Sequence, residues 1–314
     1  MENIRTDLAL EAHQMCSEQK AKEKKLSGID ISEYEKDEVF VTIIDVTSDV
    51  GEQILGKPIG RYITIEAPKL KFSDDVYKAT CIELAEQIKK MCKLTRETKT
   101  LVVGLGNKLI TPDALGPAVI EKLMVTNHIK NNNEDFLGDA YSSVCAIVPG
   151  VLGTTGIETT DIIKGVADKI NPDLVIVVDA LASRSIDRIS TTIQICDTGI
   201  SPGSGVENKR LGIDEETLGI KVIAIGVPTV VDAATIASDS IDLAFCKTKS
   251  KDCFKDSTKH AVIKKALSEN AGNMMVTPKD IDLVIKRTAK TLANGINLAL
   301  HEDITFAETE SYVG

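Results

Sequence analysis

Two aspartates, Asp113 and Asp179, stand where enzymes with parallel β-sheets commonly place their reactive groups. Asp179 directly follows Leu174–Val178, an aliphatic run typical of a strand buried on both faces. Asp113 lies in the first turn of a predicted helix, after the glycine-containing loop Gly104–Asn107. If the two strands are neighbours, both side chains face the crevice at the carboxyl edge of the sheet. Two carboxyls in one crevice cannot easily both ionise, so one keeps a proton while the other activates water, as in acid–base peptide hydrolysis.

Each aspartate also has an alternative interpretation. A carboxylate in the first turn of a helix offsets the helix macrodipole, and this structural role would suffice for Asp113. Asp179 is harder to explain in this way, because apolar neighbours make an unpaired carboxylate costly to bury. The pair could instead hold a divalent metal, although such oxygen sites want more ligands and a zinc or nickel site would want histidine. None of the four histidines, at positions 13, 128, 260 and 301, lies in the motif loops.

Two glycine motifs have the spacing of nucleotide-binding loops but lack the required chemistry. Gly51–Lys57 matches the G-x-x-x-x-G-K pattern, yet Pro58 stands where a hydroxyl must bind magnesium. We interpret this segment as the connection of a hairpin. Gly104–Gly106 follows a strand, as in a dinucleotide-binding fingerprint, but Leu109 occupies the third glycine position. We interpret these glycines as a sharp turn at the carboxyl end of a strand.

A third motif, Gly199–Gly203, matches the G-x-S-x-G of a serine nucleophile elbow. The residue after the serine must donate its N–H to the oxyanion, and Pro202 has no N–H. Cysteine catalysis is also disfavoured, because Cys145 and Cys196 fall within predicted strands. The motif is therefore interpreted as a glycine-rich turn at a cleft.

The elements that must position the aspartates alternate between strands and helices. Predicted strands cover residues 39–46, 61–66, 100–104, 144–148, 174–178, 191–196 and 221–225. Predicted helices cover 74–91 with Ser73 as N-cap, 111–126 with Thr111 as N-cap, 157–167, 232–238 and 280–300. Residues 8–37 are polar and helix-permissive, and residues 247–259 are expected to form a solvent loop. This order predicts an α/β fold with a helix-covered, mostly parallel sheet.

Composition and charge exclude several classes of protein. The 314 residues carry 37 Lys and Arg against 47 Asp and Glu, a net charge of −10 that disfavours direct binding of nucleic acid. No apolar run is long enough for a membrane span, and no signal peptide is recognisable, so a cytoplasmic protein without membrane contact is expected. The seven cysteines form no Cys-x-x-Cys pair, so neither a zinc ribbon nor a disulfide framework is expected.

Ten short motifs spread over nearly the whole chain together carry a family resemblance. They are Val102–Asn107, Thr111–Pro117, Ala146–Gly150, Gly156–Thr159, Val178–Ala180, Ser201–Gly205, Asn208–Arg210, Val222–Gly226, Pro228–Ala233 and Met275–Lys279. Any one of them is weak evidence. As a set they resemble the germination proteases, endopeptidases of spore-forming bacteria that degrade small acid-soluble spore proteins when the spore germinates.

The resemblance implies an aspartic-type endopeptidase of the spore core, without a cofactor, that works as a homotetramer and has the fold of hydrogenase maturation proteases. It places the two essential aspartates of the family on Asp113 and Asp179, the same residues that their spacing indicates. The implied substrates are small acid-soluble spore proteins, recognised as extended segments rather than through DNA. Hydrogenase maturation proteases contact nickel at analogous positions, so a metal-dependent processing peptidase is the alternative.

The N-terminus resembles a self-processing site. Family members are zymogens cleaved at an acidic residue that is followed by an apolar residue and alanine, and Asp7, Leu8 and Ala9 fit this pattern. The resemblance therefore implies cleavage between Asp7 and Leu8, a propeptide of residues 1–7 and a single α/β catalytic domain of residues 8–314. The alternative is a frayed terminus that is never processed. The chain departs from the family pattern in its short propeptide and in a shortened region at 246–271.

Backbone N–H groups are the candidates for binding the carbonyl oxygen of a substrate. By their location in loops, the candidates are Gly106, Asn107, Gly150 and Gly153.

Overall fold

A mixed sheet forms the centre of the protein, which a computed structural model describes over residues 6–19, 26–132, 141–201, 211–248 and 274–314. The strands lie in the order β1-β2-β3-β7-β8-β6-β4-β5, and β9 pairs with β8. They are β1 Ile29–Lys36, β2 Val39–Val46, β3 Gly60–Glu66, β4 Lys99–Gly104, β5 Ser143–Ile147, β6 Leu174–Ser183, β7 Thr192–Cys196, β8 Lys221–Asp232 and β9 Met275–Val276.

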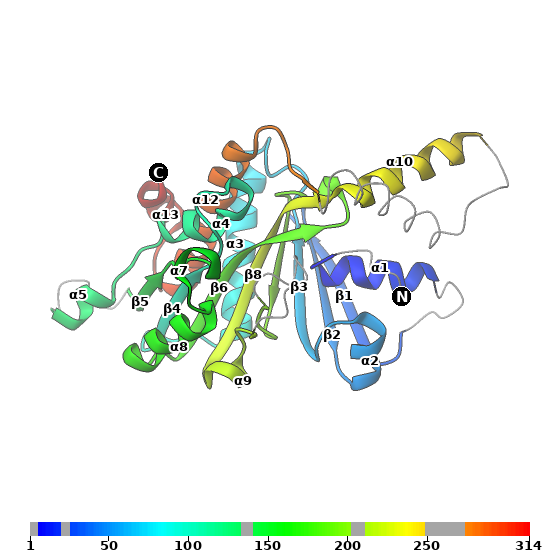
Figure 1. Cartoon of the computed structure of the whole chain (residues 1–314). Helices are drawn as coiled ribbons and strands as arrows, with labels where there is room; N and C mark the ends of the chain where they lie inside the picture. The colour runs from blue at the N-terminus through cyan, green and yellow to red at the C-terminus, as the bar shows by residue number, and fades with distance from the viewer. Residues whose placement is uncertain (1–5, 20–25, 133–140, 202–210, 249–273) are drawn as a thin grey trace.

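Helices cover both faces of this sheet (Figure 1). The longer ones are α1 Ala9–Gln19, α3 Asp74–Cys92, α8 Thr159–Ile170, α10 Ala233–Thr248, α12 Ile281–Leu300 and α13 Phe306–Val313. The shorter ones are α2 Asp49–Leu55, α4 Leu115–Ile120, α5 Asn127–Asn132, α7 Leu152–Thr155 and α9 Glu215–Leu218, with the 3-10 turns η1 Thr111–Asp113 and η2 Ile186–Arg188. Within the described residues, no helix is both long and apolar enough to span a bilayer.

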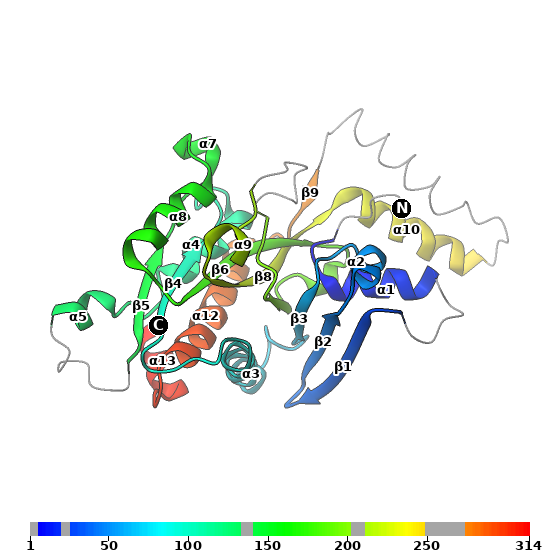
Figure 2. The same ribbon diagram turned by 90° about the horizontal axis from the view of Figure 1, so that it is seen from below.

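The two faces bury different groups of side chains. On one face α3, α4 and α12 pack together, and Leu84, Ile88 and Leu292 are fully buried there. Each such side chain contributes roughly 1.5–3 kcal/mol of hydrophobic stabilisation. On the other face, α8 and α9 cover the strands around β6, while α1 and α2 cover those around β2. Figure 2 shows α1 and α2 beside β3, apart from α8 and α9.

The sheet has a parallel half and an antiparallel half. Strands β5, β4, β6 and β8 pair in parallel, and β1, β2, β3 and β7 extend the sheet from β8 by antiparallel pairing. We use "parallel half" and "antiparallel half" for these two sets of four strands. The α/β fold expected from the sequence is confirmed, and the aliphatic runs that predicted parallel pairing are those of the parallel half.

Several predicted elements are confirmed, and β1 was missed. The strand at 39–46 and the helix beginning after Ser73 are present, with the Ser73 hydroxyl accepting the Val76 N–H. Residues 8–37, expected to be helix-permissive, form α1 only as far as Gln19, and β1 follows. After Ile29, every residue of β1 is exposed at the edge of the sheet. An edge strand with so little burial has no hydrophobic pattern for sequence analysis to detect.

The helix predicted over 111–126 is wrong in detail. Thr111 begins the 3-10 turn instead of capping a helix, and α4 is a separate helix that ends at Ile120. Pro117 in the first turn of α4 has no N–H to donate to the carbonyl four residues earlier, so one continuous α-helix cannot run through both segments. Most of the expected loop at 247–259 lies outside the described residues, as do 202–203 of the third glycine motif.

Candidate active site

The candidate site lies where β4 ends and its neighbour β6 continues. β4 pairs with β6 as far as Gly104 opposite Val178, and the Leu105 N–H then donates to the Val178 carbonyl as the chain turns away. β6 runs on through Asp179 to Ser183, paired with β8. Asp179 was expected at the end of a strand, and the structure corrects this, because only the partner strand stops there. A carboxyl at such a break in the sheet faces the crevice where α/β proteins bind ligands.

Close backbone packing places Asp113 at the same crevice. Gly106 has a φ of 109°, and a Cβ built there would lie 2.0 Å from the Asp113 carbonyl oxygen, so only glycine fits. Gly104 and Gly116 are also in close contact, since a Cβ on Gly104 would lie 2.4 Å from the Gly116 oxygen. The Asn107 N–H donates to Asp113 Oδ2 at 2.7 Å. The turn after β4 therefore fixes both the backbone and the carboxyl of Asp113.

The pKa values of both carboxyls are raised, and the charge of Asp113 contributes to the shift of Asp179. Burial and the negative charge of Asp113 raise the pKa of Asp179 to about 8, and the bond from the Ala180 N–H offsets this only in part. Burial also raises the pKa of Asp113, while the bond from the Asn107 N–H acts in the opposite direction. The raised pKa of Asp179 favours a proton on this carboxyl near neutral pH, which is the state that general acid–base chemistry by a carboxyl pair requires.

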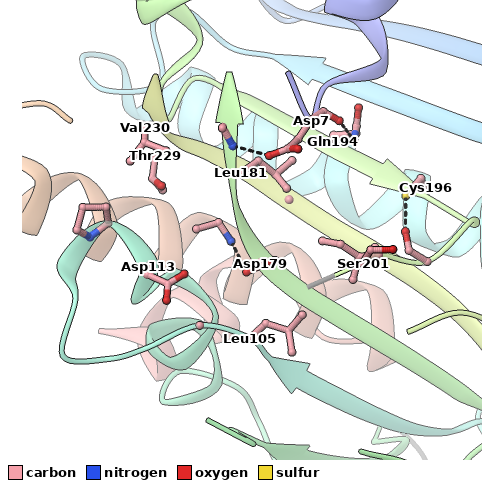
Figure 3. A pocket seen from close by; sticks show the side chains of 18 of the residues that line it. Asp7, Leu105, Asp113, Asp179, Leu181, Gln194, Cys196, Ser201, Thr229 and Val230 are labelled. Carbon is pink, nitrogen blue, oxygen red and sulfur yellow. Dashed lines mark hydrogen bonds between the residues drawn. The ribbon is translucent and has the colours of Figure 1, made fainter. Parts of the chain in front are cut away.

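A cavity of about 780 Å³ contains both aspartates. Figure 3 shows Asp113 beside Asp179 and Asp7 beside Gln194, with Leu181 between the two pairs. Among the expected carbonyl-binding residues, Gly106, Asn107 and Gly150 line it, whereas Gly153 on α7 does not. The Asn107 N–H is already donated to Asp113. The N–H of Asn107 therefore acts on the carboxyl rather than on a substrate.

The described residues contain no metal-ligating cluster around the pair. No histidine is among the residues that line the cavity. No group of three or more His, Cys, Asp and Glu side chains has the geometry to hold an ion within the described part of the chain. Because Asp113 and Asp179 alone provide few of the oxygen ligands that a hard cation needs, the described side chains do not make up a complete metal site.

The N-terminal segment lies in the same cavity as the aspartates. The Asp7 N–H donates to the Ala182 carbonyl at 3.1 Å, and the Ala182 N–H donates to Asp7 Oδ2 at 2.8 Å. The Asp7 carbonyl accepts from Lys57 Nζ at 2.9 Å and from Gln194 Nε2 at 3.2 Å. Leu8, the next residue, is completely buried. The two residues of the expected cleavage site are therefore bound, not frayed.

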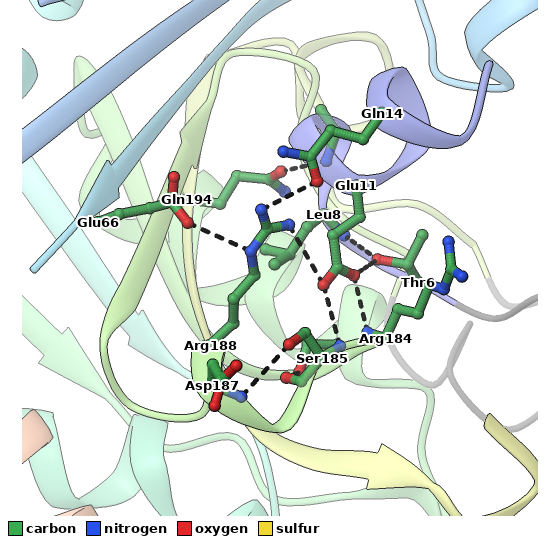
Figure 4. Close-up of polar contacts among 12 residues, drawn as sticks. Thr6, Leu8, Glu11, Gln14, Glu66, Arg184, Ser185, Asp187, Arg188 and Gln194 are labelled. Atoms are coloured by element: carbon green, nitrogen blue, oxygen red, sulfur yellow. Dashed lines mark hydrogen bonds and ion pairs between the residues drawn. The ribbon is translucent and has the colours of Figure 1, made fainter. Parts of the chain in front are cut away.

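A buried ion pair anchors the helix that follows. Glu11 is 3% exposed and forms an ion pair with the guanidinium of Arg188. The same guanidinium also forms an ion pair with Glu66. Glu11 further accepts the N–H groups of Arg184 and Ser185 at 2.7 and 3.2 Å. Figure 4 shows these contacts converging on Glu11 at the start of α1. They fix the position of the segment that enters the cavity.

Two residues of the cavity, Lys57 and Gln194, were not predicted as site residues. Lys57 is the lysine of the segment with phosphate-loop spacing. In the structure its ammonium group donates a hydrogen bond to a peptide carbonyl. Gln194 lies within β7, and nothing in its sequence surroundings distinguishes it from any other strand residue. The hairpin interpretation is consistent with the antiparallel pairing of β2 and β3 on either side of α2.

A helix-covered α/β sheet that brings two coupled carboxyls and a bound peptide segment into one cavity has the groups that a hydrolase acting on peptides requires. The germination protease family model matches residues 9–253 and 251–313. The germination protease of Caldanaerobacter subterraneus subsp. tengcongensis is 48% identical, covering 97% of this chain and 96% of that protein. That of Clostridium tetani is 44% identical, covering 99% of both. The chain belongs to the germination protease family and is a peptidase.

A solved structure is also similar in part. The [NiFe] hydrogenase maturation protease HycI from Thermococcus kodakarensis is 18% identical, with a TM-score of 0.32, covering 64% of this chain and 93% of that one.

Proposed function

We propose that this protein is an aspartic-type endopeptidase that begins the degradation of small acid-soluble spore proteins during germination. Relatives over essentially the whole length of the chain are germination proteases. The proposed substrates are DNA-binding proteins that the enzyme takes as extended segments, without binding DNA itself. The proposed location is the cytoplasm of the spore core, and the proposed assembly is a homotetramer that needs no cofactor.

The observation that carries this proposal is the coupling of Asp113 and Asp179 in one cavity. The ionised carboxyl, Asp113, takes a proton from a water molecule as its oxygen attacks the peptide carbonyl carbon. Asp179 gives its proton to the carbonyl oxygen, which avoids a free negative charge in the tetrahedral intermediate. As the C–N bond breaks, Asp113 gives the proton that it took from water to the leaving amine. Asp179 takes its proton back from a hydroxyl of the intermediate as the new carboxyl group forms, so the pair holds one proton as before.

Self-processing between Asp7 and Leu8 is the second part of the proposal. Residues 1–7 then form the propeptide and residues 8–314 the catalytic domain. The binding of Asp7 in the cavity that Asp113 and Asp179 line supports this assignment. Mass spectrometry of the purified chain after activation should find Leu8 at the N-terminus, and an intact Met1 in fully active enzyme would exclude it.

The decisive experiment compares wild type, Asp113→Asn and Asp179→Asn with a purified small acid-soluble spore protein in the presence of EDTA. Asparagine keeps the size of the side chain and removes its titratable proton. General acid and base groups each contribute roughly 10²–10⁴ in rate, so both variants should lose about 10³-fold or more in kcat. Asp30→Asn, on the exposed edge strand β1, is the matched control and should cleave like wild type.

The EDTA arm separates the aspartic from the metal-dependent mechanism. Wild-type cleavage that persists in EDTA and disappears in both variants supports the proposal. Wild-type cleavage that disappears in EDTA and returns with nickel or zinc would make the two aspartates metal ligands instead. Light scattering tests the assembly separately, and the mass of a monomer would contradict the homotetramer.

A further inference from the structure

Lys57 is a half-buried cation in the cavity that the acid–base mechanism does not use. It follows Gly56, which ends α2 in the left-handed conformation with a φ of 68°. Burial lowers the pKa of the Lys57 ammonium, and the nearby charge of Asp7 acts against this shift. Its Nζ donates to the Asp7 carbonyl at 2.9 Å. A lysine is costly to bury even in part without a polar partner, and here a peptide carbonyl accepts a hydrogen bond from it.

Gln194 brackets the same short peptide from the other side. Its Nε2 donates to the Asp7 carbonyl at 3.2 Å, and its Oε1 accepts the Ala9 N–H at 2.6 Å. One side-chain amide thus binds the backbone before and after Leu8. A side-chain amide that donates to one backbone carbonyl and accepts from a nearby backbone N–H binds the peptide backbone itself. Such binding does not depend on which side chain lies between the two groups.

The backbone of Ala182 makes the contact that depends on which side chain stands at position 7. Its N–H donates to Asp7 Oδ2 and its carbonyl accepts the Asp7 N–H, at the position where the register of β6 against β8 shifts. Such bulges commonly re-aim backbone groups beside functional sites. An acidic side chain at this position receives a charge-assisted hydrogen bond and lies in the field of the Lys57 ammonium.

We propose that Lys57, Gln194 and the Ala182 backbone form a peptide subsite that selects an acidic side chain and holds the extended backbone that follows it. In this chain Asp7, Leu8 and Ala9 fill the subsite in cis. The inference rests on the proposed peptidase function for its substrate, because the subsite opens into the cavity that Asp113 and Asp179 line. Lys57 is a specificity-determining residue in this account, and the cis segment competes with substrate for the same groups.

Hydrogen exchange of the full-length protein tests the subsite without requiring any activity. Exchange in the peptide covering residues 6–19 should be faster by about tenfold in Lys57→Met, because the docked segment opens more often. Asp7→Asn, which leaves the walls of the cavity intact, should also accelerate it. Lys122→Met is the matched control, since Lys122 Nζ donates to the backbone carbonyl of Val313, which is not among the residues lining the cavity.

Peptide cleavage tests the selectivity. The probes are a ten-residue peptide copying residues 3–12 and the same peptide with asparagine in place of aspartate. For wild type, kcat/KM should favour the aspartate peptide by about tenfold or more. In Lys57→Met this ratio should fall towards one, and Lys57→Arg should restore part of it. Competition from the N-terminal segment does not change this ratio of kcat/KM values. It lowers the concentration of accessible enzyme equally for both peptides.

Two results would overturn the proposal. One is unchanged exchange of residues 6–19 in both Lys57→Met and Asp7→Asn. The other is an unchanged preference for the aspartate peptide in Lys57→Met. If neither peptide is cleaved by wild type while exchange responds as described, the peptidase proposal fails and the subsite remains.

Discussion

The parallel half of the sheet contributes carboxyl groups to the cavity, and the antiparallel half contributes hydrogen-bond donors. The parallel half supplies Asp179 from β6 and Asp113 from the turn after β4. The antiparallel half supplies Gln194 from β7 and Lys57 from the connection that leads into β3. The first pair can exchange protons, whereas the second pair donates hydrogen bonds to a peptide backbone. The cavity lies at the junction of the two halves.

Asp7 and Asp179 show how strongly the surroundings decide what an aspartate does. Asp7 is bound through its N–H, its carbonyl and its carboxyl, with a lysine ammonium nearby. Asp179 accepts a hydrogen bond from the Ala180 N–H, and burial together with the like charges of Asp113 and Asp7 raises its pKa. A carboxylate with hydrogen-bond donors around it is held in place. A buried carboxyl facing other carboxyls retains its proton and is suited to acid–base chemistry.

Apart from replacing the two aspartates themselves, the largest effect is expected from Gly106→Ala in the parallel half. A Cβ there would lie 2.0 Å from the Asp113 oxygen, on a backbone with positive φ, so the turn must move and carry Asp113 with it. We expect kcat to fall by about 10²-fold, as small misplacements of a reacting group do. Gly153→Ala is the matched control, because nothing lies within 4 Å of its added Cβ. Equal kinetics for the two variants would show that the turn does not position Asp113.

The pH dependence tests the proton on Asp179. Its pKa is raised to about 8, so the acid form required for donation is lost as the pH rises through that value. We expect kcat/KM to fall about tenfold per pH unit above pH 8. In the unprocessed chain, Asp7→Asn removes one of the charges that raise this pKa, so the titration of Asp179 followed by ¹³C NMR should move to lower pH. A titration that stays in place would mean that the docked N-terminal segment does not influence the carboxyl pair.

A smaller effect, on stability alone, is expected around Arg188. Arg188→Met leaves the buried Glu11 carboxylate without its cationic partner, at a cost of about 3 kcal/mol in the free energy of unfolding. Lys36→Met removes an exposed pair with Glu86 and should cost less than about 1 kcal/mol. Urea denaturation monitored by circular dichroism measures both. Equal losses would show that the anchor of α1 is no stronger than a surface contact.

The sequence was more informative about the parallel half than about the antiparallel half. Continuous aliphatic runs such as Leu174–Val178 are visible in one dimension, and an aspartate directly after such a run stands out. The continuation of β6 beyond Asp179 was missed, because it depends on pairing with β8 and not on local pattern. Gln194 and Lys57 contact Asp7 only because the N-terminal segment folds back across the sheet. The spacing of residues near positions 57 and 194 gives no signal of this long-range contact.

The most direct test of the account is a carboxyl titration by NMR, with ¹³C at the aspartate side chains. We expect one aspartate of the wild type to titrate at about pH 8, to be missing from the spectrum of Asp179→Asn, and to titrate at lower pH in Asp113→Asn. This result would establish that the pair holds a proton under neutral conditions. If every aspartate of the wild type titrates near the ordinary value of about 4, the acid–base assignment of Asp113 and Asp179 is contradicted.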